Sequence, residues 1–545
     1  MDMADLLDGN FTRGRTAFRL VSREGISVER CGQRTLLRVE PEALRRLAAE
    51  AFRDLNFLFR TSQLLQWEAI LDDPASSAND RFVAAALLKN AAIAAEGALP
   101  SCQDTGTATV MGCKGEDVVT GGRDVEALTE GVRQAYDRHA FRMSQVAPIS
   151  LFEDANTRDN LPAQVDLYAA AGGEYRLLFV AKGGGSANKT TLTQETRALL
   201  EPEALERFLR AKVSALGTAG CPPYHLAVVL GGTSVEANLK VLKLATAGAL
   251  DHMPALGEAA AAARDLPRRD PGWEERLMAI ARESGLGAQF GGRHLALDAR
   301  VLRLARHAAS LPVSFGVSCS AHRNALARVT EDGAWLEELD GNPARFLPKA
   351  LPVLEAAGRG APRIDLSRPI RDVCRELSRH AVGTLVLLSG PLVVARDAVH
   401  ARLFSLLREG KSLPRWFLEH PVYYAGPSKT PPGRPIGSFG PTTAQRMDPY
   451  VPAFMERGAS LVMLAKGNRS RTVTEACVRH GGFYLGTIGG AAALIASGHV
   501  VREEVLDYAD LGMEAARRIE VRDLPAFLVT DDKGGGLYGA GPAEG

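Results

Sequence analysis

The segment LPVSFGVSCS, residues 311–320, indicates how this chain folds. It is an apolar run typical of a buried strand, and it ends at a cysteine. Two earlier runs have the same form, YRLLFVAKGG (residues 175–184) and HLAVVLGG (residues 225–232), and each leads into glycine. In α/β folds the loops that follow strands carry functional residues. The three runs therefore predict strands that deliver cysteine and glycine loops to one region.

Helical patterns separate and precede these strands. Residues 203–216 and 233–250 have apolar spacings of three and four, and so do residues 41–59 and 80–98. Pro100 ends the last of these patterns just before Cys102. The alternation predicts an α/β fold with mixed layers.

A change of texture divides the chain. Residues 341–369 are rich in proline and glycine and interrupt the alternation of helix and strand. We therefore expect a larger N-terminal α/β domain (residues 1–340), a linker (341–369) and a smaller C-terminal α/β domain (370–545). Strands are predicted in the latter at residues 384–390, 422–428, 460–467, 482–490 and 526–532, whereas residues 111–117, MGCKGED, are expected to form a loop.

Composition excludes several classes of protein. The 545 residues carry 65 basic and 64 acidic side chains, a net charge of +1, which argues against nucleic acid as the main partner. The first residues lack an apolar signal-peptide core, and we find no apolar run long enough to span a membrane. Scattered cysteines suit a reducing compartment, so we expect a cytoplasmic protein.

Three cysteines are placed to bind a metal group. Cys102 in PSCQDTGT, Cys221 in AGCPPYH and Cys319 in VSCSAHR lie in loops marked by glycine or proline, and no cysteine of the chain belongs to a C-x-x-C pair. Three separate thiolates can hold three corners of a four-iron cube and leave the fourth iron open to act as a Lewis acid. The remaining cysteines are interpreted as ordinary thiols: Cys31, Cys113, Cys374 and Cys477.

An alternative metal site uses the two motifs C-P-P-Y-H and C-S-A-H. Together they offer two cysteines and two histidines, His225 and His322, which is a ligand set for structural zinc. This alternative leaves Cys102 and its neighbours Gln103 and Asp104 unexplained.

Two further segments suit an anion. KGGGSANKT, residues 182–190, lacks the second glycine of a phosphate loop, but its glycines leave N–H groups open to a phosphate or a carboxylate. The Gly/Pro-rich residues 425–441 lead to a predicted helix start at Thr442 and Thr443, with Arg446 one turn in. Arg396 and Lys466 follow predicted strands and can point to the same place.

Together these segments closely resemble class I fumarate hydratase, the iron–sulfur-dependent, single-chain form. The matching segments cover nearly the whole chain in the family's order. They are residues 101–115 (SCQDTGTATVMGCKG), 182–190, 231–240 (GGTSVEANLK), 285–292 (GLGAQFGG), 318–323 (SCSAHR), 425–460 and 527–535 (FLVTDDKGG).

The resemblance implies a hydro-lyase of the citric acid cycle that hydrates fumarate reversibly to (S)-malate. It also implies an oxygen-sensitive [4Fe–4S] cluster on Cys102, Cys221 and Cys319, and a homodimer. Thr442 coupled to Asp104 is the implied acid–base pair, and His307 has an orienting or proton-handling role. The implied substrate-binding residues are Gln103, Asp104, Arg142, Gly185, Arg396, Thr442, Arg446 and Lys466.

Two alternatives to this reading remain open on the sequence. A related hydratase of mesaconate or tartrate differs by one methyl or hydroxyl on the substrate, although the fused single chain favours fumarate. The second alternative is a non-catalytic protein that binds zinc or a nucleotide. Such a protein would lack the brown colour of an iron–sulfur protein.

Overall fold

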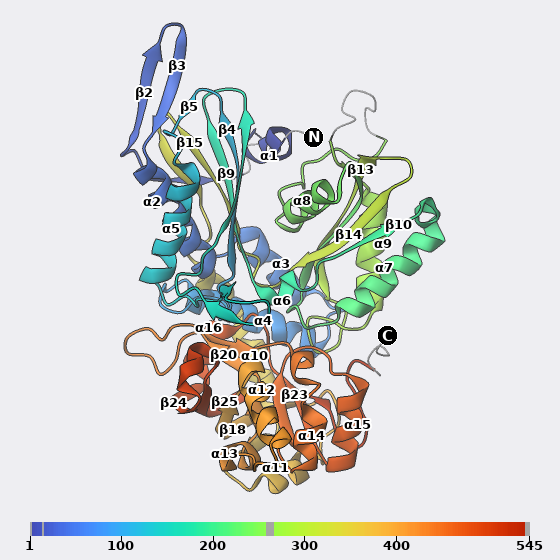
Figure 1. The fold of residues 1–545 in the computed structure, drawn as a ribbon. Coiled ribbons are helices and arrows are strands. Elements are labelled where there is room, and N and C mark those ends of the chain that lie inside the picture. The colour runs from blue at the N-terminus through green and yellow to red at the C-terminus, as the bar shows by residue number, and fades with distance from the viewer. Residues whose placement is uncertain (1–2, 13–15, 258–265, 540–545) are drawn as a thin grey trace.

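The computed structural model describes residues 3–12, 16–257 and 266–539. Three large sheets organise the chain (Figure 1). Two of them belong to the first 340 residues and lie side by side in the upper part of the view, while the third belongs to the C-terminal part below. Helices cover these sheets, so the predicted mixed α/β class is confirmed.

The first sheet has six strands in the order β1-β16-β15-β9-β4-β8. The expected loop at residues 111–117 is wrong for its first part, because β4 continues through Cys113 to Gly115 as a buried strand. The alternation T-A-T-V-M-G-C suits a strand, and Gly112 is needed there because a Cβ would lie 2.6 Å from a methyl carbon of Leu177. The strands are β1 (Phe18–Ser22), β4 (Thr107–Gly115), β8 (Gln164–Ala170), β9 (Tyr175–Lys182), β15 (Asn324–Thr330) and β16 (Gly333–Glu337).

The second sheet has five strands in the order β10-β14-β11-β13-β12. β11 and β13 are parallel, and β14 runs antiparallel to β11, so the start of β11 and the end of β14 share one edge. That edge carries Cys221 and Cys319. The strands are β10 (Thr191–Glu195), β11 (Tyr224–Gly232), β12 (Arg268–Arg269), β13 (Ala296–Arg306) and β14 (Leu311–Ser318).

The third sheet has seven strands in the order β17-β18-β19-β22-β23-β25-β24. Its first five strands are parallel, so their carboxyl ends meet at one edge. In open α/β sheets that edge is where ligands bind. The strands are β17 (Arg363–Asp365), β18 (Leu385–Val394), β19 (Val422–Tyr423), β22 (Val462–Ala465), β23 (Phe483–Gly486), β24 (Val500–Asp507) and β25 (Ala516–Thr530).

Short strand pairs complete the β structure. β2 (Ile26–Cys31) and β3 (Arg34–Val39) form a hairpin that projects from the body and is joined by β5 (Val118–Val119) (Figure 1). The other pairs are β6 (Val146–Pro148) with β7 (Asp154–Asn156), and β20 (Ala425–Pro427) with β21 (Phe439–Pro441).

The helices follow the predicted periodicity. The helical stretch from residue 40 to 98 is three helices, α2 (Pro41–Phe57), α3 (Thr61–Asp72) and α4 (Ala78–Ala94), and Ser77 with Asp80 forms a capping box at the start of α4. The other helices are α1 (Met3–Thr12), α5 (Asp124–Arg138), α6 (Gly184–Ala187), α7 (Pro202–Leu216), α8 (Val235–Thr246), α9 (Pro271–Glu283), α10 (Leu347–Gly360), α11 (Ile370–Leu377), α12 (Asp397–Arg408), α13 (Arg415–Glu419), α14 (Val451–Glu456), α15 (Arg471–His480) and α16 (Ala492–Gly498).

Residues 341–369 contain more structure than a connection needs. They form α10, which packs against α4, and β17, which pairs with β18 of the third sheet. The division of the chain into domains at these residues stays a prediction.

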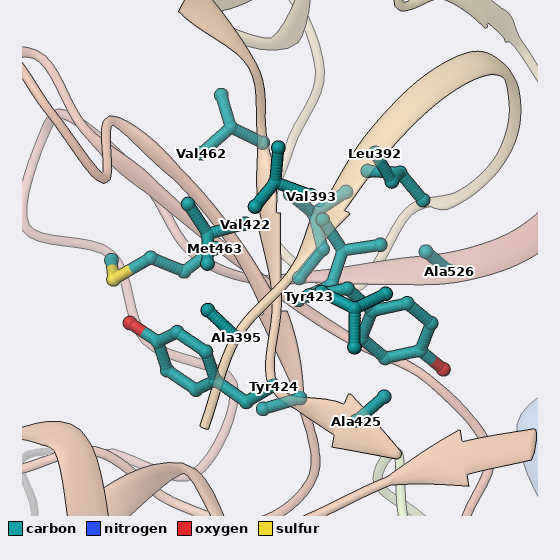
Figure 2. Packing of buried hydrophobic residues seen from close by; sticks show 14 of the residues in the cluster. Leu392, Val393, Ala395, Val422, Tyr423, Tyr424, Ala425, Val462, Met463 and Ala526 are labelled. Carbon is teal, nitrogen blue, oxygen red and sulfur yellow. The ribbon is translucent and has the colours of Figure 1, made fainter. Parts of the chain in front are cut away.

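Separate cores hold the parts together. The third sheet has its own core, in which side chains of β18, β19 and β22 interdigitate (Figure 2). A second cluster lies where the halves meet and combines Phe82 of α4 with Ile488 and Phe527 from the C-terminal part. The two halves therefore share a core directly behind the region where their loops converge. Among the described helices, none has the length and apolar character needed to cross a membrane.

Candidate active site

A cavity of about 270 Å³ lies between the two halves. Its walls come from the loop after α4, the glycine loop at α6, the cysteine edge of the second sheet and the carboxyl edge of the third sheet. The structure brings together nearly all the residues that the sequence proposed for the site. Those lining the cavity are Cys102, Gln103, Asp104, Arg142, Gly185, Cys221, Cys319, Arg396, Thr442, Arg446 and Lys466.

The three cysteines come from three loops, two of which are hydrogen-bonded to each other. Cys221 precedes β11 and Cys319 follows β14, and the N–H of Ser320 donates to the carbonyl of Cys221 at 3.0 Å. Cys102 follows α4, and the N–H of the preceding residue Ser101 donates to the carbonyl of Asn56 at 2.8 Å. All three thiols are free.

The space around these thiols suits a bound group. Gly489 must lack a side chain, because a Cβ there would lie 2.3 Å from Sγ of Cys221. In the part of the chain that the structure describes, no three His, Cys, Asp or Glu side chains are arranged around a single metal ion. Three isolated thiolates suit a cluster instead, since each one binds a different iron.

Burial and charge act on the thiols in opposite directions. Burial raises the pKa of Cys102 to about 11, although Arg323 opposes this effect. Cys221 accepts a hydrogen bond from Nζ of Lys466 at 2.7 Å. A thiol must lose its proton to bind iron, so positive charge next to the thiols favours metal binding.

Asp104 is a half-buried carboxylate held by backbone amides. Its Oδ2 accepts from the N–H of Gly184 at 2.8 Å, and its Oδ1 accepts from the N–H of Gly106 at 3.1 Å. Burial alone would raise its pKa, but Arg142 and Arg323, with the Gly184 amide, bring the pKa of Asp104 below its ordinary value. The glycine loop predicted to bind an anion thus binds a carboxylate of the chain itself.

Two cations of the cavity are paired with carboxylates. Arg396 begins α12 and forms an ion pair with Glu514, and Arg446 lies 2.7 Å from Oδ2 of Asp397. Burial lowers the pKa of Arg396 to about 10, which leaves it cationic at neutral pH. These pairs hold the guanidinium groups in place before any ligand is bound.

Thr442 lies where the Gly/Pro loop meets the third sheet. Its N–H donates to the carbonyl of Tyr424 at 2.8 Å, and its Oγ1 accepts from Nη1 of Arg446 at 3.4 Å. A helix was predicted to start at Thr442 and Thr443. The structure has a single 3₁₀ turn there, Ala444–Met447, and the next helix, α14, begins at Val451. The structure records no hydrogen bond between the side chains of Thr442 and Asp104, two residues that it describes.

Gln103 and Gly185 contact the other walls. Gln103 donates from Nε2 to the carbonyl of Pro441 at 3.2 Å, which links the Cys102 loop to the C-terminal half. A Cβ at Gly440 would lie 2.6 Å from Oε1 of Gln103, and one at Gly185 would lie 3.2 Å from Nζ of Lys466. Glycine is therefore required where the polar side chains crowd together.

His307 is the proposed site residue that lies outside the cavity lining. It lies in the exposed turn between β13 and β14, where its Nδ1 accepts from the N–H of Ala309. β13 starts beside the cysteine edge and runs away from it over eleven residues, or about 30 Å at the usual rise of a strand. The role of His307 stays a prediction that the contacts of this chain do not support.

The histidines of the zinc alternative serve another purpose. The rings of His225 and His322 lie 4.2 Å apart. His225 is held by Asp298 and Gln63, and His322 by Ser318. Burial places the pKa of His322 well below its ordinary value. These rings pack behind the cysteine loops and neither is among the residues that line the cavity.

Arg323 is a cavity residue that the sequence reasoning missed. It lines the cavity, is 3% exposed and ends the segment SCSAHR, of which only Cys319 and His322 were considered as ligands. The signal for it in the sequence was a cationic side chain four residues after Cys319, a proposed metal ligand. Thr443, Ser144, Gln145 and Asn188 also line the cavity and were not proposed.

Comparison with known protein families finds a match in each half of the chain. Residues 45–328 match the family model described as "Fumarate hydratase (Fumerase)", and residues 333–541 match the one described as "Fumarase C-terminus".

Individual relatives match along almost their entire length. The chain is 50% identical over 527 residues to "Fumarate hydratase class I, anaerobic" of Escherichia coli (strain K12), covering 96% of this chain and 95% of the relative. It is 49% identical to "Fumarate hydratase 1, mitochondrial" of Leishmania major, covering 96% and 95%. It is 50% identical to "Fumarate hydratase class I, aerobic" of Salmonella typhimurium, covering 96% and 89%.

Proposed function

The chain belongs to the class I fumarate hydratase family, and from this premise we propose that its cavity hydrates fumarate reversibly to (S)-malate with the help of a [4Fe–4S] cluster. The observation that supports this proposal most is the meeting of three free cysteines, several cations and one carboxylate in a single cavity. The alternative substrates mesaconate and tartrate are not favoured, because the relatives at about 50% identity are named fumarate hydratases.

Cys102, Cys221 and Cys319 are the residues that would hold the cluster. When bound, it would supply a Lewis acid at the iron that has no protein thiolate. Gly489 keeps the space beside Cys221 open for such a group. Lys466 adds positive charge where the thiolates gather.

The cations bind and orient a dicarboxylate. Arg396 and Arg446 lie on the third-sheet side of the cavity, and Arg142 lies on the opposite, N-terminal side. Guanidinium groups form charge-assisted hydrogen bonds to carboxylates in a fixed fork geometry. During proton removal, charge accumulates on the substrate carboxylate next to the lost proton, and cations fixed in advance stabilise it.

Proton transfer is assigned to Thr442 and Asp104. The hydrogen bond from Arg446 favours negative charge on Oγ1 of Thr442. Asp104 is ionised within the cavity and lies against the glycine loop. Because no direct contact joins the two side chains, the proton passes between them through the substrate or a water.

Cellular location and assembly follow as further proposals. We infer a cytoplasmic homodimer from the family resemblance and the reducing compartment that free cysteines require.

Anaerobic reconstitution followed by a substrate panel tests the proposed function. The chain is loaded with iron and sulfide and assayed with fumarate, mesaconate and tartrate. We expect a brown protein with broad visible absorption that converts fumarate faster than the other two acids. A loaded protein that prefers mesaconate or tartrate, or one that stays colourless, would contradict the proposal.

A further inference from the structure

Arg323 is a buried cation whose pairing differs from that of Arg396 and Arg446. It lies between Cys319 and the start of β15, and its Nη1 donates to Oδ1 of Asn56 at 2.8 Å. Its Nε is buried without a hydrogen-bond partner among the described residues. No carboxylate in the described ranges forms an ion pair with it. A buried guanidinium without a carboxylate partner is costly, so its charge is expected to act on a nearby anion.

Asp104 is the carboxylate among the described residues that line the same cavity. A Cβ placed on Gly183 would lie 3.1 Å from Oδ2 of Asp104 and 3.5 Å from Nη2 of Arg323. The two side chains therefore flank the same point of the glycine loop. A side chain at Gly183 would crowd the carboxylate, whereas its contact with the guanidinium would be an ordinary van der Waals distance.

Arg323 also joins the segments that carry Asp104. Its carbonyl accepts from the N–H of Ala181 at 3.0 Å, which fixes the strand leading into the glycine loop. The side chain of Asn56 accepts the hydrogen bond from the Arg323 guanidinium. The backbone carbonyl of Asn56 accepts a hydrogen bond from the N–H of Ser101 at 2.8 Å. Arg323 is thus connected to the Cys102 loop and to the glycine loop, which are the two segments on either side of the Asp104 carboxylate.

One contact of the guanidinium points away from the cavity. Nη1 is directed to Asn56, which does not line the cavity, and Nη2 lies against Gly183. Arg323 forms part of the wall behind Asp104, whereas Arg142, Arg396 and Arg446 remain for the substrate carboxylates.

We propose that Arg323 is a positioning residue for the hydration reaction, which holds the Asp104 carboxylate against the glycine loop and balances its charge without contacting the substrate. This inference rests on the proposed role of Asp104 in proton transfer.

Kinetics of Arg323→Met, with the charge removed at similar length, test the proposal. We expect kcat to fall about 100-fold while KM changes less than about threefold, because positioning matters in the transition state and not in ground-state binding. Arg323→Lys keeps the charge and should recover activity to within about tenfold of the unchanged chain. The inhibition constant of succinate, a dicarboxylate that cannot be dehydrated, should stay the same.

Matched variants control for the fold. Arg328→Met removes an arginine of β15, the strand that follows Arg323, whose side chain stacks over the ring of Phe18, and it should leave both constants unchanged. Iron content and thermal unfolding are measured for every variant. If Arg323→Met does not fold, Asn56→Ser, which removes the acceptor that orients Arg323, should lower kcat about three- to tenfold with KM unchanged.

The outcomes separate this inference from the proposed function. A rise of tenfold or more in KM and in the succinate constant of Arg323→Met would show direct contact with substrate and overturn the positioning role. Unchanged kcat would overturn it as well. Failure of the unaltered, cluster-loaded chain to hydrate fumarate would instead remove the proposed function itself.

Discussion

At the scale of single residues, position in a loop or inside an element separates the cysteines that line the cavity from those that pack in a core. Cys374 and Cys477 lie in the core of the third sheet, and Cys113 lies inside β4. Cys102, Cys221 and Cys319 lie in loops that line the cavity. A side chain in a loop at the end of an element can reach a shared site, whereas a side chain inside a helix or strand packs in a core.

Serine substitutions of the three cavity cysteines should abolish the cluster. Cys102→Ser, Cys221→Ser and Cys319→Ser each remove a soft ligand that a hydroxyl does not replace. Iron and sulfide per chain after anaerobic reconstitution measure the effect. Cys374→Ser and Cys477→Ser serve as controls and should retain iron, with a loss of stability of about 1–3 kcal/mol from the buried hydroxyl. Full iron content in any of the first three variants would refute the ligand assignment.

Thr442 and Arg446 should fail in different ways. Thr442→Ala removes a small hydroxyl and should lower kcat by about 10²–10⁴ with little change in KM. Arg446→Ala removes a charge-assisted contact to a carboxylate and should raise KM by at least about tenfold. Steady-state kinetics of fully loaded variants decide between these outcomes, and Arg415→Ala, at an exposed position on α13, is the control. Wild-type kcat in Thr442→Ala would leave Asp104 to act without the hydroxyl.

At the scale of elements, glycines decide how closely loops approach the thiols and the Asp104 carboxylate. Gly183 and Gly184 admit Asp104, Gly440 admits Gln103, and Gly489 admits Cys221. Each is a place where a side chain from one element meets the backbone of another. The glycine-rich segments visible in the sequence are therefore contact points of tertiary structure.

Gly489→Ala should prevent cluster assembly while the chain still folds. The added methyl would lie 2.3 Å from Sγ of Cys221 and 3.1 Å from Cδ of Lys466, so the thiol must move. We expect most of the iron to be lost, measured by iron content and visible absorption. Gly358→Ala in α10 meets nothing within 4 Å and should keep full activity, with a gain in stability of about 0.5–1 kcal/mol. Equal iron content in the two variants would argue against the tight contact.

At the scale of the whole molecule, the cavity exists only when both halves are present. The cysteines come from the first 340 residues, and Arg396, Thr442, Arg446 and Lys466 come from the third sheet. The shared core of Phe82, Ile488 and Phe527 lies directly behind them. The two halves are thus joined by apolar packing and not only by the chain connection.

A fragment of residues 1–340 should keep the cysteines but not hydrate fumarate. It lacks the C-terminal cations and exposes the face of α4 that packs on α10 and α16. Hydration assays and iron analysis of the fragment, with the full chain as reference, measure this. Co-expression with residues 341–545 should restore activity if the shared core reassembles. Hydration by the fragment alone would show that the C-terminal residues are not needed.

Exposure to air should inactivate the loaded enzyme, and ferrous iron with thiol should restore it. One iron of the proposed cluster has no protein ligand, so oxidation releases it first. Activity is followed over time in air, under nitrogen and with a chelator, and the apo chain provides the baseline. An enzyme indifferent to all three conditions would contradict an exposed iron.

The sequence by itself identified most of the elements and eleven of the residues that line the cavity. Strands such as β11 and β14 are recognisable because an apolar run of fixed length and a terminal glycine or cysteine are local patterns. The three cysteines are recognisable because they lie outside such runs. The cavity then gathered every proposed cluster ligand and substrate-binding residue from segments up to 364 positions apart, from Cys102 to Lys466.

Only the tertiary structure decided which of these residues act on one another. Nothing local shows that Arg323 lies behind Asp104, that the glycine loop holds that carboxylate, or that His307 lies at the far end of its strand from the cysteines. The second half of β4, expected as part of a loop at residues 111–117, also depended on pairing with β8 and β9. Such contacts join residues that are distant in sequence. They are set by the order of the strands and by the packing of the two halves, and local sequence patterns predict neither of these.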